Sequence, residues 1–363
     1  MNRLYYPGHG CWISDKWQFN GMRTLIMENN LLRIVILIDK GTDIVEFRHK
    51  PADIDFLLQL PGGIRNPKHD IPSAYTGSTF LDYYSGGWNE VLPNGGPLVN
   101  YRGAELGQHG EISLVPWEYA ILTDTPEKIC VRFRVNAVRT PLSVEKTLTL
   151  NHNEAKLIIE ETLTNHAGET VQCMWGQHIA FGRPFLNEGA IIDVPECRFI
   201  VHEAMDGYEP RRFMPDSQSA INEVPSPDDS HTIDARIVPP FGDEQAQEMA
   251  YLAELQDGWY AIRNPHRGVG FGLRFDHSLF KYVWYWQQLG NVAGGYPWWG
   301  NLHCTALEPW TSYPTGGLNE AIDNGSALTL GAGETVSHRM IATAFNATGA
   351  VHGIDEHGDI TFG

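Results

Sequence analysis

The chain lacks a disulfide framework, a zinc-binding cysteine pattern and any long hydrophobic run. Its 363 residues include five cysteines, an odd number without a Cys-x-x-Cys pair, so we expect reduced, packed thiols and no metal site. No segment approaches the roughly 18 consecutive apolar residues of a membrane helix, and the N-terminus has no long apolar stretch of the signal-peptide kind. These absences predict a soluble, cytoplasmic protein.

Basic charge is also scarce. The chain carries 26 Lys and Arg against 44 Asp and Glu, a formal net charge of −18. Such a charge repels nucleic-acid phosphates and anionic lipid headgroups, so we expect neither nucleic acid nor a membrane as a partner. Its simplest role is solubility. The glycine pairs Gly86-Gly87 and Gly294-Gly295 lack the strand, loop and helix setting of a phosphate-binding motif.

Aromatic residues, by contrast, are plentiful, and β-branched and aromatic segments recur between Gly, Pro, Asn and Asp. This pattern is typical of an antiparallel all-β fold. Within Ala155 to Asn165 apolar and polar residues largely alternate, so one face of that strand can be buried and the other wet. The predicted strands are Arg23 to Glu28, Leu31 to Ile38, Ile129 to Val138, Leu142 to Leu150, Ala155 to Asn165, Thr170 to Phe181, Met249 to Leu255, Trp259 to Arg263, Val269 to Phe275 and Leu279 to Trp286.

Helix signals are few. A short helix is predicted near Asp53 to Gln59, limited by Pro51 and Pro61. From residue 205 to residue 247 the chain turns polar, Pro-rich and acidic, as either a linker or a long excursion between strands. We favour the excursion, because strand-like segments of the same character resume directly after it. Length alone suggests two domains, but all-β folds often run long, so we expect a single domain over residues 1–363.

Three short stretches far apart in the sequence carry acid and base chemistry. They are Gln108-His109-Gly110-Glu111, Gln177-His178-Ile179-Ala180-Phe181 and Leu307-Glu308-Pro309-Trp310. Two imidazoles and a carboxylate can give one proton and remove another near pH 7. Apolar surroundings predict a lowered pKa for His178 and, where Glu308 is buried, a raised pKa for its carboxyl.

Each of these residues also has an ordinary structural explanation. His109 taken alone reads as a structural or surface imidazole, although Gly107 and Gly110 on either side let a ligand or backbone approach closely. His178 taken alone is equally compatible with a hydrogen-bonded core histidine. Glu308 would be unremarkable at an exposed strand end, but glutamate is rarely buried without a reason.

Taken together, the motifs resemble the aldose 1-epimerases, or mutarotases, of the galactose mutarotase-like superfamily. His109-Gly110 followed by Trp117 is similar to the family's His-Gly motif, and His178 followed three residues later by Phe181 is similar to its strand motif. Leu307-Glu308-Pro309 resembles its late Glu-Pro motif. The segment Leu328 to Thr335 is similar to the turn and final strand that end these domains.

The resemblance implies a β-supersandwich with few short helices and a concave sugar-binding face. It also implies that His178 is the general acid toward the ring oxygen and Glu308 the general base on the anomeric hydroxyl. His109 would bind or polarise the region of the ring oxygen. Removing the O1 proton while protonating O5 opens the ring, and rotation followed by reclosure gives the other anomer, without a cofactor.

The chain departs from the family where substrate is chosen. The branch that handles hexose 6-phosphates usually has an arginine four residues after the motif histidine, where this chain has Ser113. Galactose enzymes place an arginine well before the histidine, whereas Arg102 lies only seven residues upstream. The predicted sugar-binding residues are polar or aromatic groups near the motifs, with Asp276 added as a candidate for the family's aspartate: Arg102, Trp88, Asn89, Gln177, Asp276, Gln287 and Trp310.

The sequence therefore predicts an isomerase that interconverts sugar anomers, with a small sugar as its substrate. Two alternatives stay open: a carbohydrate-binding protein without activity on the same fold, and a glycoside hydrolase or lyase relative. The second needs a carboxylate partnered with Glu308, and none is evident from the sequence. The pattern leaves the sugar and the oligomeric state, monomer or homodimer, open.

Overall fold

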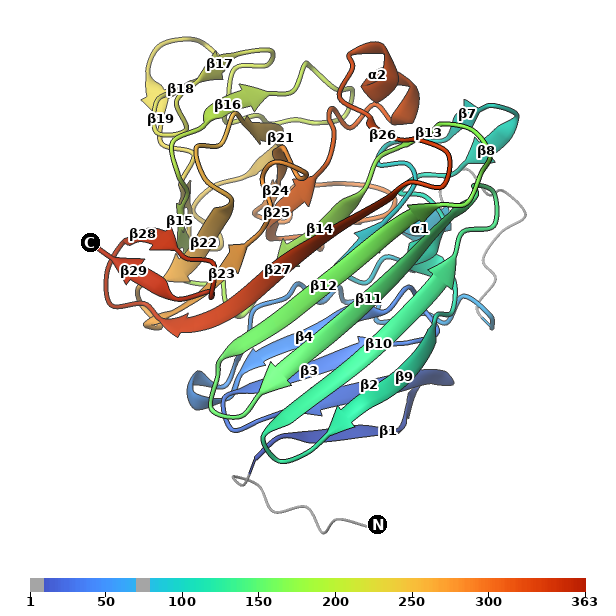
Figure 1. The fold of residues 1–363 in the computed structure, drawn as a ribbon. Coiled ribbons are helices and arrows are strands. Elements are labelled where there is room, and N and C mark those ends of the chain that lie inside the picture. Colours follow the sequence, from blue (N-terminus) through green and yellow to red (C-terminus); the bar gives the residue numbers. More distant parts are fainter. Residues whose placement is uncertain (1–9, 70–78) are drawn as a thin grey trace.

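Two large antiparallel sheets dominate the computed structural model, which describes residues 10–69 and 79–363 (Figure 1). The first sheet has 12 strands. Its strands, in spatial order with β5 paired to β4 at the side, are β1 (Trp12–Phe19), β2 (Met22–Glu28), β3 (Leu32–Leu37), β4 (Asp43–His49), β5 (Ile54–Asp55), β6 (Trp88–Val91), β14 (Gly176–Phe181), β25 (Cys304–Trp310), β24 (Tyr282–Leu289), β21 (Ala246–Ala253), β16 (Arg198–Val201) and β17 (Gln218–Ser219).

The second sheet has nine strands and lies against the first. Its order is β20 (Ile237–Val238), β15 (Ala190–Asp193), β22 (Trp259–Asn264), β23 (Val269–Arg274), β27 (Thr335–Asn346), β12 (Lys156–Asn165), β11 (Leu142–Asn151), β10 (Lys128–Asn136) and β9 (Glu118–Asp124). Four two-stranded ribbons complete the strands: β7 (Val99–Tyr101) with β8 (Ala104–Leu106), β13 (Val171–Cys173) with β26 (Leu328–Leu330), β18 (Val224–Pro225) with β19 (Thr232–Ile233), and β28 (Val351–Ile354) with β29 (Ile360–Phe362).

The inner faces of the two sheets share one hydrophobic core. Phe271 of β23 packs edge-on against Phe47 of β4, with ring centroids 5.3 Å apart, and also against Trp88 of β6 at 6.3 Å. Along β12 the buried residues alternate, as expected for a strand with one face in the core. The all-β prediction is confirmed. The single-domain prediction over residues 1–363 stays a prediction.

Helices are short and few in the described part of the chain. They are α1 (Thr79–Tyr83), α2 (Leu318–Asp323) and the 3₁₀ turns η1 (Lys50–Ala52) and η2 (Ile112–Leu114). None of the helices in residues 10–69 and 79–363 has the length and apolar character to cross a membrane.

The predicted helix near Asp53 to Gln59 is wrong. Pro51 lies within the short 3₁₀ turn η1, which begins at Lys50, and the chain then becomes extended as β5, with bridges from Leu57 to Phe181 and from Gln59 to Gly86. Backbone pairing with the first sheet replaces the helix. The segment from residue 205 to residue 247 holds the short strands β17 to β20 and the start of β21, so it contributes to both sheets.

Candidate active site

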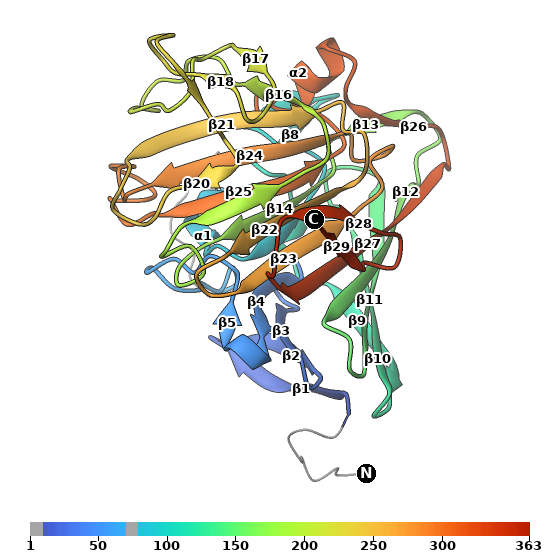
Figure 2. The ribbon, with the colours of Figure 1, turned by 90° about the vertical axis from the view of Figure 1, so that its left-hand side faces the viewer.

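The central strands β14 and β25 bring the two most widely separated motifs face to face. Their register pairs Gly176 with Trp310 and Ala180 with Ala306, which puts His178 directly opposite Glu308. The Nε2 atom of His178 lies 3.5 Å from Oε1 of Glu308. Figure 2 shows β21, β24, β25 and β14 side by side in the first sheet, so the pair lies at the middle of a broad strand surface.

Strand alternation decides which face of the sheet carries the pair. Gln177 of β14 points between the sheets, because its Nε2 donates to Oε2 of Glu161 on β12 at 3.0 Å. His178, one residue further on, therefore points to the opposite, outer face, and Glu308 shares that face through the register. The paired acid and base groups thus lie on the side of the first sheet that the second sheet does not cover.

His109 reaches the same place from the loop between β8 and η2. Its ring centroid lies 5.4 Å from that of His178. The backbone of His109 has a φ of 54°, and Gly110 follows with a φ of 66° against Leu92, where a Cβ would lie 2.1 Å from the Leu92 carbonyl oxygen. A non-glycine residue in the left-handed region is uncommon and needs surrounding structure to hold it. Backbone hydrogen bonds from His109 to the Gly96 carbonyl and from Glu111 to the Leu92 carbonyl hold this part of the loop.

The second oxygen of Glu308 is fixed by an indole. Nε1 of Trp310 donates to Oε2 of Glu308 at 2.9 Å, and the Trp310 ring stacks on Trp284 with centroids 4.1 Å apart. A Cβ on Gly176 would lie 2.2 Å from the Trp310 ring, so glycine is what allows the indole to lie over β14. Oε2 of the carboxyl group therefore accepts the indole hydrogen bond, while Oε1 faces His178.

A cavity of about 240 Å³, called here the central cavity, opens onto these groups. Its size suits one small ligand rather than a drug-sized one. Among the described residues that line it, Glu308 is the single carboxylate and there is no lysine or arginine. The wall residues are Phe80, Leu81, Tyr84, Gln108, His109, His178, Tyr208, Met249, Trp284, Trp286, Pro297, Trp298, Glu308 and Thr315.

Burial shifts the pKa values of all three titratable motif residues. It lowers the pKa of His178 well below its usual value, with a further lowering from the neighbouring His109, and it lowers the pKa of His109 to about 4. Burial raises the pKa of Glu308 to about 8, against the opposing effect of the hydrogen bond from Trp310. For His178 and Glu308 these are the directions that the sequence surroundings predict.

The His178 and Glu308 pair consequently holds one proton at neutral pH. The carboxyl is protonated below about pH 8, and the imidazole is neutral well into the acid range. A pair with one proton contains one acid and one base in total. This is the proton count that a reaction needs when one proton is delivered and another is taken up at neighbouring atoms.

The other predicted site residues of β6 and β14 lie beneath or beside the central cavity rather than in its wall. Trp88 is on the inner face, where its Nε1 donates to Oε1 of Gln177 at 2.7 Å. Asn89 is fully buried and stands opposite His178 in the register of β6 and β14. Gln177 links Trp88 to the second sheet. Trp310, on β25, donates to Glu308 but is not among the residues that line the central cavity.

Arg102, Asp276 and Gln287 lie away from the central cavity wall. Arg102 is exposed and bonds Glu169 and the Thr170 carbonyl. Asp276 accepts hydrogen bonds from the backbone and hydroxyl of Ser278 in a turn. Gln287 is fully buried on the inner face, where it accepts from Arg212 at 2.9 Å and donates to Thr305 at 3.2 Å. The structure does not bring these three to the motif residues.

Several cavity residues carry no motif of their own. Phe80 and Tyr84 come from α1 and the turn after it, and their rings contact His109 at 4.6 Å and His178 at 5.2 Å. Tyr208 comes from the polar excursion, where its hydroxyl accepts from Nε1 of Trp286 at 2.9 Å. The spacing of Phe80 and Tyr84, four residues apart, is a helical signal. Nothing near Tyr208 marks it in the sequence.

Disulfides and metal-binding clusters are both missing from the part of the chain that the structure describes. All five cysteines are unpaired. Within residues 10–69 and 79–363, no group of three or more His, Cys, Asp and Glu side chains is arranged to hold a metal ion.

Comparison with known proteins places this geometry in a family and a fold. The family model described as "domain of unknown function (DUF4432)" matches residues 19–343. A search of curated proteins finds no match. Many solved structures match, and three are described here.

The three structures share the fold at low sequence identity. A Klebsiella pneumoniae protein provisionally named an aldose 1-epimerase has a TM-score of 0.71 and 17% identity, over 92% of this chain and 83% of its own. A galactose mutarotase-like protein from Clostridium acetobutylicum has a TM-score of 0.62 and 14% identity, over 93% and 99%. A galactose mutarotase related enzyme from Lactobacillus acidophilus has a TM-score of 0.59 and 17% identity, over 90% and 98%. The fold is therefore galactose mutarotase-like, as the sequence motifs predict.

Proposed function

The chain belongs to the DUF4432 family, and from this membership, its fold and the geometry at the central cavity we propose that it is an aldose 1-epimerase-like isomerase, which interconverts the anomers of a sugar. The observation that carries the proposal is the buried His178 and Glu308 pair, 3.5 Å apart and sharing one proton. Buried groups with strongly shifted pKa values in a cavity are typical of catalytic sites. The solved structures with this fold supply the reaction class as an analogy.

The reaction follows from moving two protons. The base takes the proton from O1, the acid gives its proton to O5, the C1–O5 bond breaks and C1 becomes an aldehyde carbon. Rotation about C1–C2 presents the other carbonyl face, and reclosure returns both protons. No net proton, electron or group is gained or lost, so the side chains of the pair are sufficient and no cofactor is required.

The proton of the pair rests on Glu308 before substrate binds, because the pKa of Glu308 exceeds that of His178. Sugar hydroxyls that donate to the carboxylate would favour its ionised form and lower its pKa. The proton can then cross the 3.5 Å gap to His178, which leaves His178 as the acid at O5 and Glu308 as the base at O1. His109, with its neutral imidazole, would hydrogen-bond the sugar beside O5 and remain uncharged.

The aromatic walls suit the C–H faces of a sugar ring. Trp284, Trp286, Trp298 and Tyr84 surround the central cavity, and flat amphipathic rings bury large apolar areas while their polar ends stay hydrogen-bonded. The single carboxylate in the described cavity wall argues against a glycoside hydrolase, because that chemistry canonically uses two. A sugar-binding protein without activity uses the same walls but has no need of the shared proton.

The test is sugar-anomer exchange measured by NMR or polarimetry on a panel of aldoses, uronates and oxidised sugars. We expect exchange faster than in buffer for at least one sugar. Exchange no faster than buffer over the whole panel would contradict the proposal. Binding without exchange would favour the carbohydrate-binding alternative, and release of new reducing ends from an oligosaccharide would favour the hydrolase alternative.

A further inference from the structure

The central cavity is the first of three that follow one another along the molecule. The second, called here the Trp299 cavity, has about 340 Å³ and shares four wall residues with the central cavity, namely Leu81, Tyr84, Pro297 and Trp298. The third, called here the Phe19 cavity, has about 390 Å³ and shares Leu60 and Gly63 with the Trp299 cavity. Through these shared wall residues the three cavities adjoin in a row that leads away from His178 and Glu308.

Exposed aromatic side chains gather along this row. Five aromatic residues are exposed in the described chain, and four of them line the two outer cavities: Tyr296 and Trp299 in one, Trp17 and Phe19 in the other. Trp299 is 70% exposed and Trp17 is 59% exposed. Exposed aromatic surface is costly in water and, when it is concentrated in a groove, marks a ligand site.

The backbone of Trp299 has a strained conformation that costs free energy. Its φ of 50° lies in the left-handed region, which a bulky residue rarely adopts. Hydrogen bonds from its own N–H to the Gly295 carbonyl and from Asn301 Nδ2 to its carbonyl fix that conformation. The strained backbone thus carries an indole that faces solvent at the mouth of the Trp299 cavity. Packing of this indole contributes little stability that would offset the strain.

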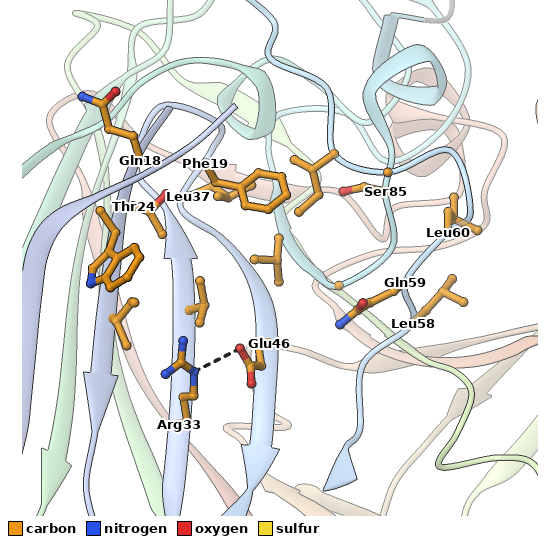
Figure 3. Close-up of a pocket in the computed structure, with 17 residues that line it drawn as sticks. Gln18, Phe19, Thr24, Arg33, Leu37, Glu46, Leu58, Gln59, Leu60 and Ser85 are labelled. Atoms are coloured by element: carbon orange, nitrogen blue, oxygen red, sulfur yellow. Dashed lines mark hydrogen bonds and ion pairs between the residues drawn. The ribbon is translucent and has the colours of Figure 1, made fainter. Parts of the chain in front are cut away.

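Polar groups stand beside the aromatic faces. In the Trp299 cavity the Tyr296 hydroxyl donates to Oδ1 of Asp82 at 2.8 Å, and Nη1 of Arg65 donates to the Asp82 carbonyl at 2.9 Å. In the Phe19 cavity Nε of Arg33 donates to Oε2 of Glu46 at 3.2 Å, and Figure 3 shows Phe19 on one side of the space with Gln59 and Leu60 on the other. Flat apolar faces with hydrogen-bonding groups at their edges match linked sugar rings.

We propose that the three cavities together bind a reducing oligosaccharide, with its reducing-end ring in the central cavity and the following rings over Trp299 and then toward Phe19. This inference rests on the proposed function, because anomer exchange needs a free anomeric hydroxyl on C1 beside His178 and Glu308. The next sugar must then be attached through another hydroxyl of the reducing-end ring. The adjoining Trp299 cavity and Phe19 cavity would then hold the sugars that follow.

The experiment compares the binding of glucose, cellobiose, cellotriose, maltose and maltotriose by titration calorimetry, together with anomer exchange on each. We expect at least one disaccharide to bind about tenfold more tightly than glucose, the upper end of what one aromatic contact supplies. In Trp299→Ala the ratio of disaccharide to glucose affinity should fall to near one. In Phe19→Ala only the additional gain of the trisaccharide should fall.

Phe362→Ala is the matched control, since Phe362 is the fifth exposed aromatic and lines neither outer cavity. Its affinity ratios should equal those of the wild type. Disaccharides bound no more tightly than glucose, or a Trp299→Ala variant with an unchanged ratio, would overturn the extended site while leaving the proposed activity intact. An affinity gain without exchange on any sugar would instead contradict the proposed activity and support the extended site.

Discussion

At the scale of single residues, burial sets the proton balance of the pair. An exposed glutamate and histidine would titrate near their ordinary values, about 4.3 and 6.5, and would carry their useful single proton only between those two. Here burial raises the pKa of the Glu308 carboxyl to about 8 and lowers the pKa of the His178 imidazole well below its ordinary value. The order of the two pKa values is reversed and the range with one shared proton is widened.

The pH dependence of kcat/KM should show this reversal. Above about pH 8 Glu308 loses the only proton of the pair, so the acid is lost and kcat/KM should fall. In the acid range both groups carry protons only below the lowered pKa of His178, so the acid limb should lie well below pH 6.5. An alkaline limb near pH 6.5, measured by polarimetry over pH 4–10, would contradict the burial argument.

Trp310 provides a variant that moves this limb in a known direction. Its indole N–H stabilises the ionised form of Glu308 and so lowers the pKa of the carboxyl. In Trp310→Phe that stabilisation is lost, and the alkaline limb should move to higher pH by about one unit or more, since a hydrogen bond to a charged group contributes roughly 1.5 kcal/mol or more. Thermal unfolding of the variant must be measured alongside, because Trp310 is fully buried.

The sequence predicts the identity of the reactive residues better than that of the residues around them. His109, His178 and Glu308 stand in motifs, whereas Gln287 lies one residue after Trp286 and differs from it only in strand parity. Whether a side chain faces the cavity or the core depends on register, which is fixed by pairing with distant strands. Tyr208 enters the cavity from a polar segment, so no local pattern identifies it.

At the scale of elements, the strand under the pair is anchored by buried charges. Nζ of Lys146 on β11 lies 2.7 Å from Oε2 of Glu90 on β6, and Nε1 of Trp175 donates to the other Glu90 oxygen at 3.0 Å. On β12, Glu161 accepts from Gln177 of β14 and pairs with His338 of β27 at 2.8 Å. These contacts join the two sheets directly behind His178.

Lys146→Ala should destabilise the protein strongly, because it leaves the buried Glu90 carboxyl without the ammonium group that pairs with it. Breaking a buried pair typically costs about 3–5 kcal/mol. Lys156→Ala is the matched control on the next strand, since Lys156 pairs with the exposed Asp359 and a surface pair contributes about 0–1 kcal/mol. Urea unfolding should separate the two variants; equal free energies of unfolding would rule out a structural role for the buried network.

The limits of prediction at this scale also have physical causes. The segment Thr170 to Phe181 reads as one strand, but it forms β13 and β14 with a break at Met174 and Trp175, because β13 pairs with β26 and β14 pairs with β6 and β25. A change of partner strand leaves no signal in local composition. The long regular strands β11 and β12 match their predicted ranges closely, since burial alternates along all of β12 and along the first seven residues of β11.

At the scale of the whole molecule, the charge of −18 surrounds a central cavity whose described walls carry no lysine or arginine. A phosphate on the sugar therefore meets repulsion and finds no cation there. We expect kcat/KM for a hexose 6-phosphate to be at least about tenfold below that of the free hexose at low salt, with the difference shrinking as ionic strength rises. A higher kcat/KM for the phosphorylated sugar would contradict the predicted electrostatic repulsion.

The central claim is that Glu308 takes part in proton transfer at the anomeric hydroxyl of a sugar, and anomer exchange in Glu308→Gln tests it most directly. The amide keeps the shape of the side chain but can neither hold nor release the shared proton. Glu105→Gln is the control, a nearby exposed glutamate outside the cavity. By NMR exchange spectroscopy on the best sugar, the Glu308→Gln rate should fall at least about 100-fold, while Glu105→Gln keeps the wild-type rate. A folded Glu308→Gln protein that exchanges anomers at the wild-type rate would contradict the claim.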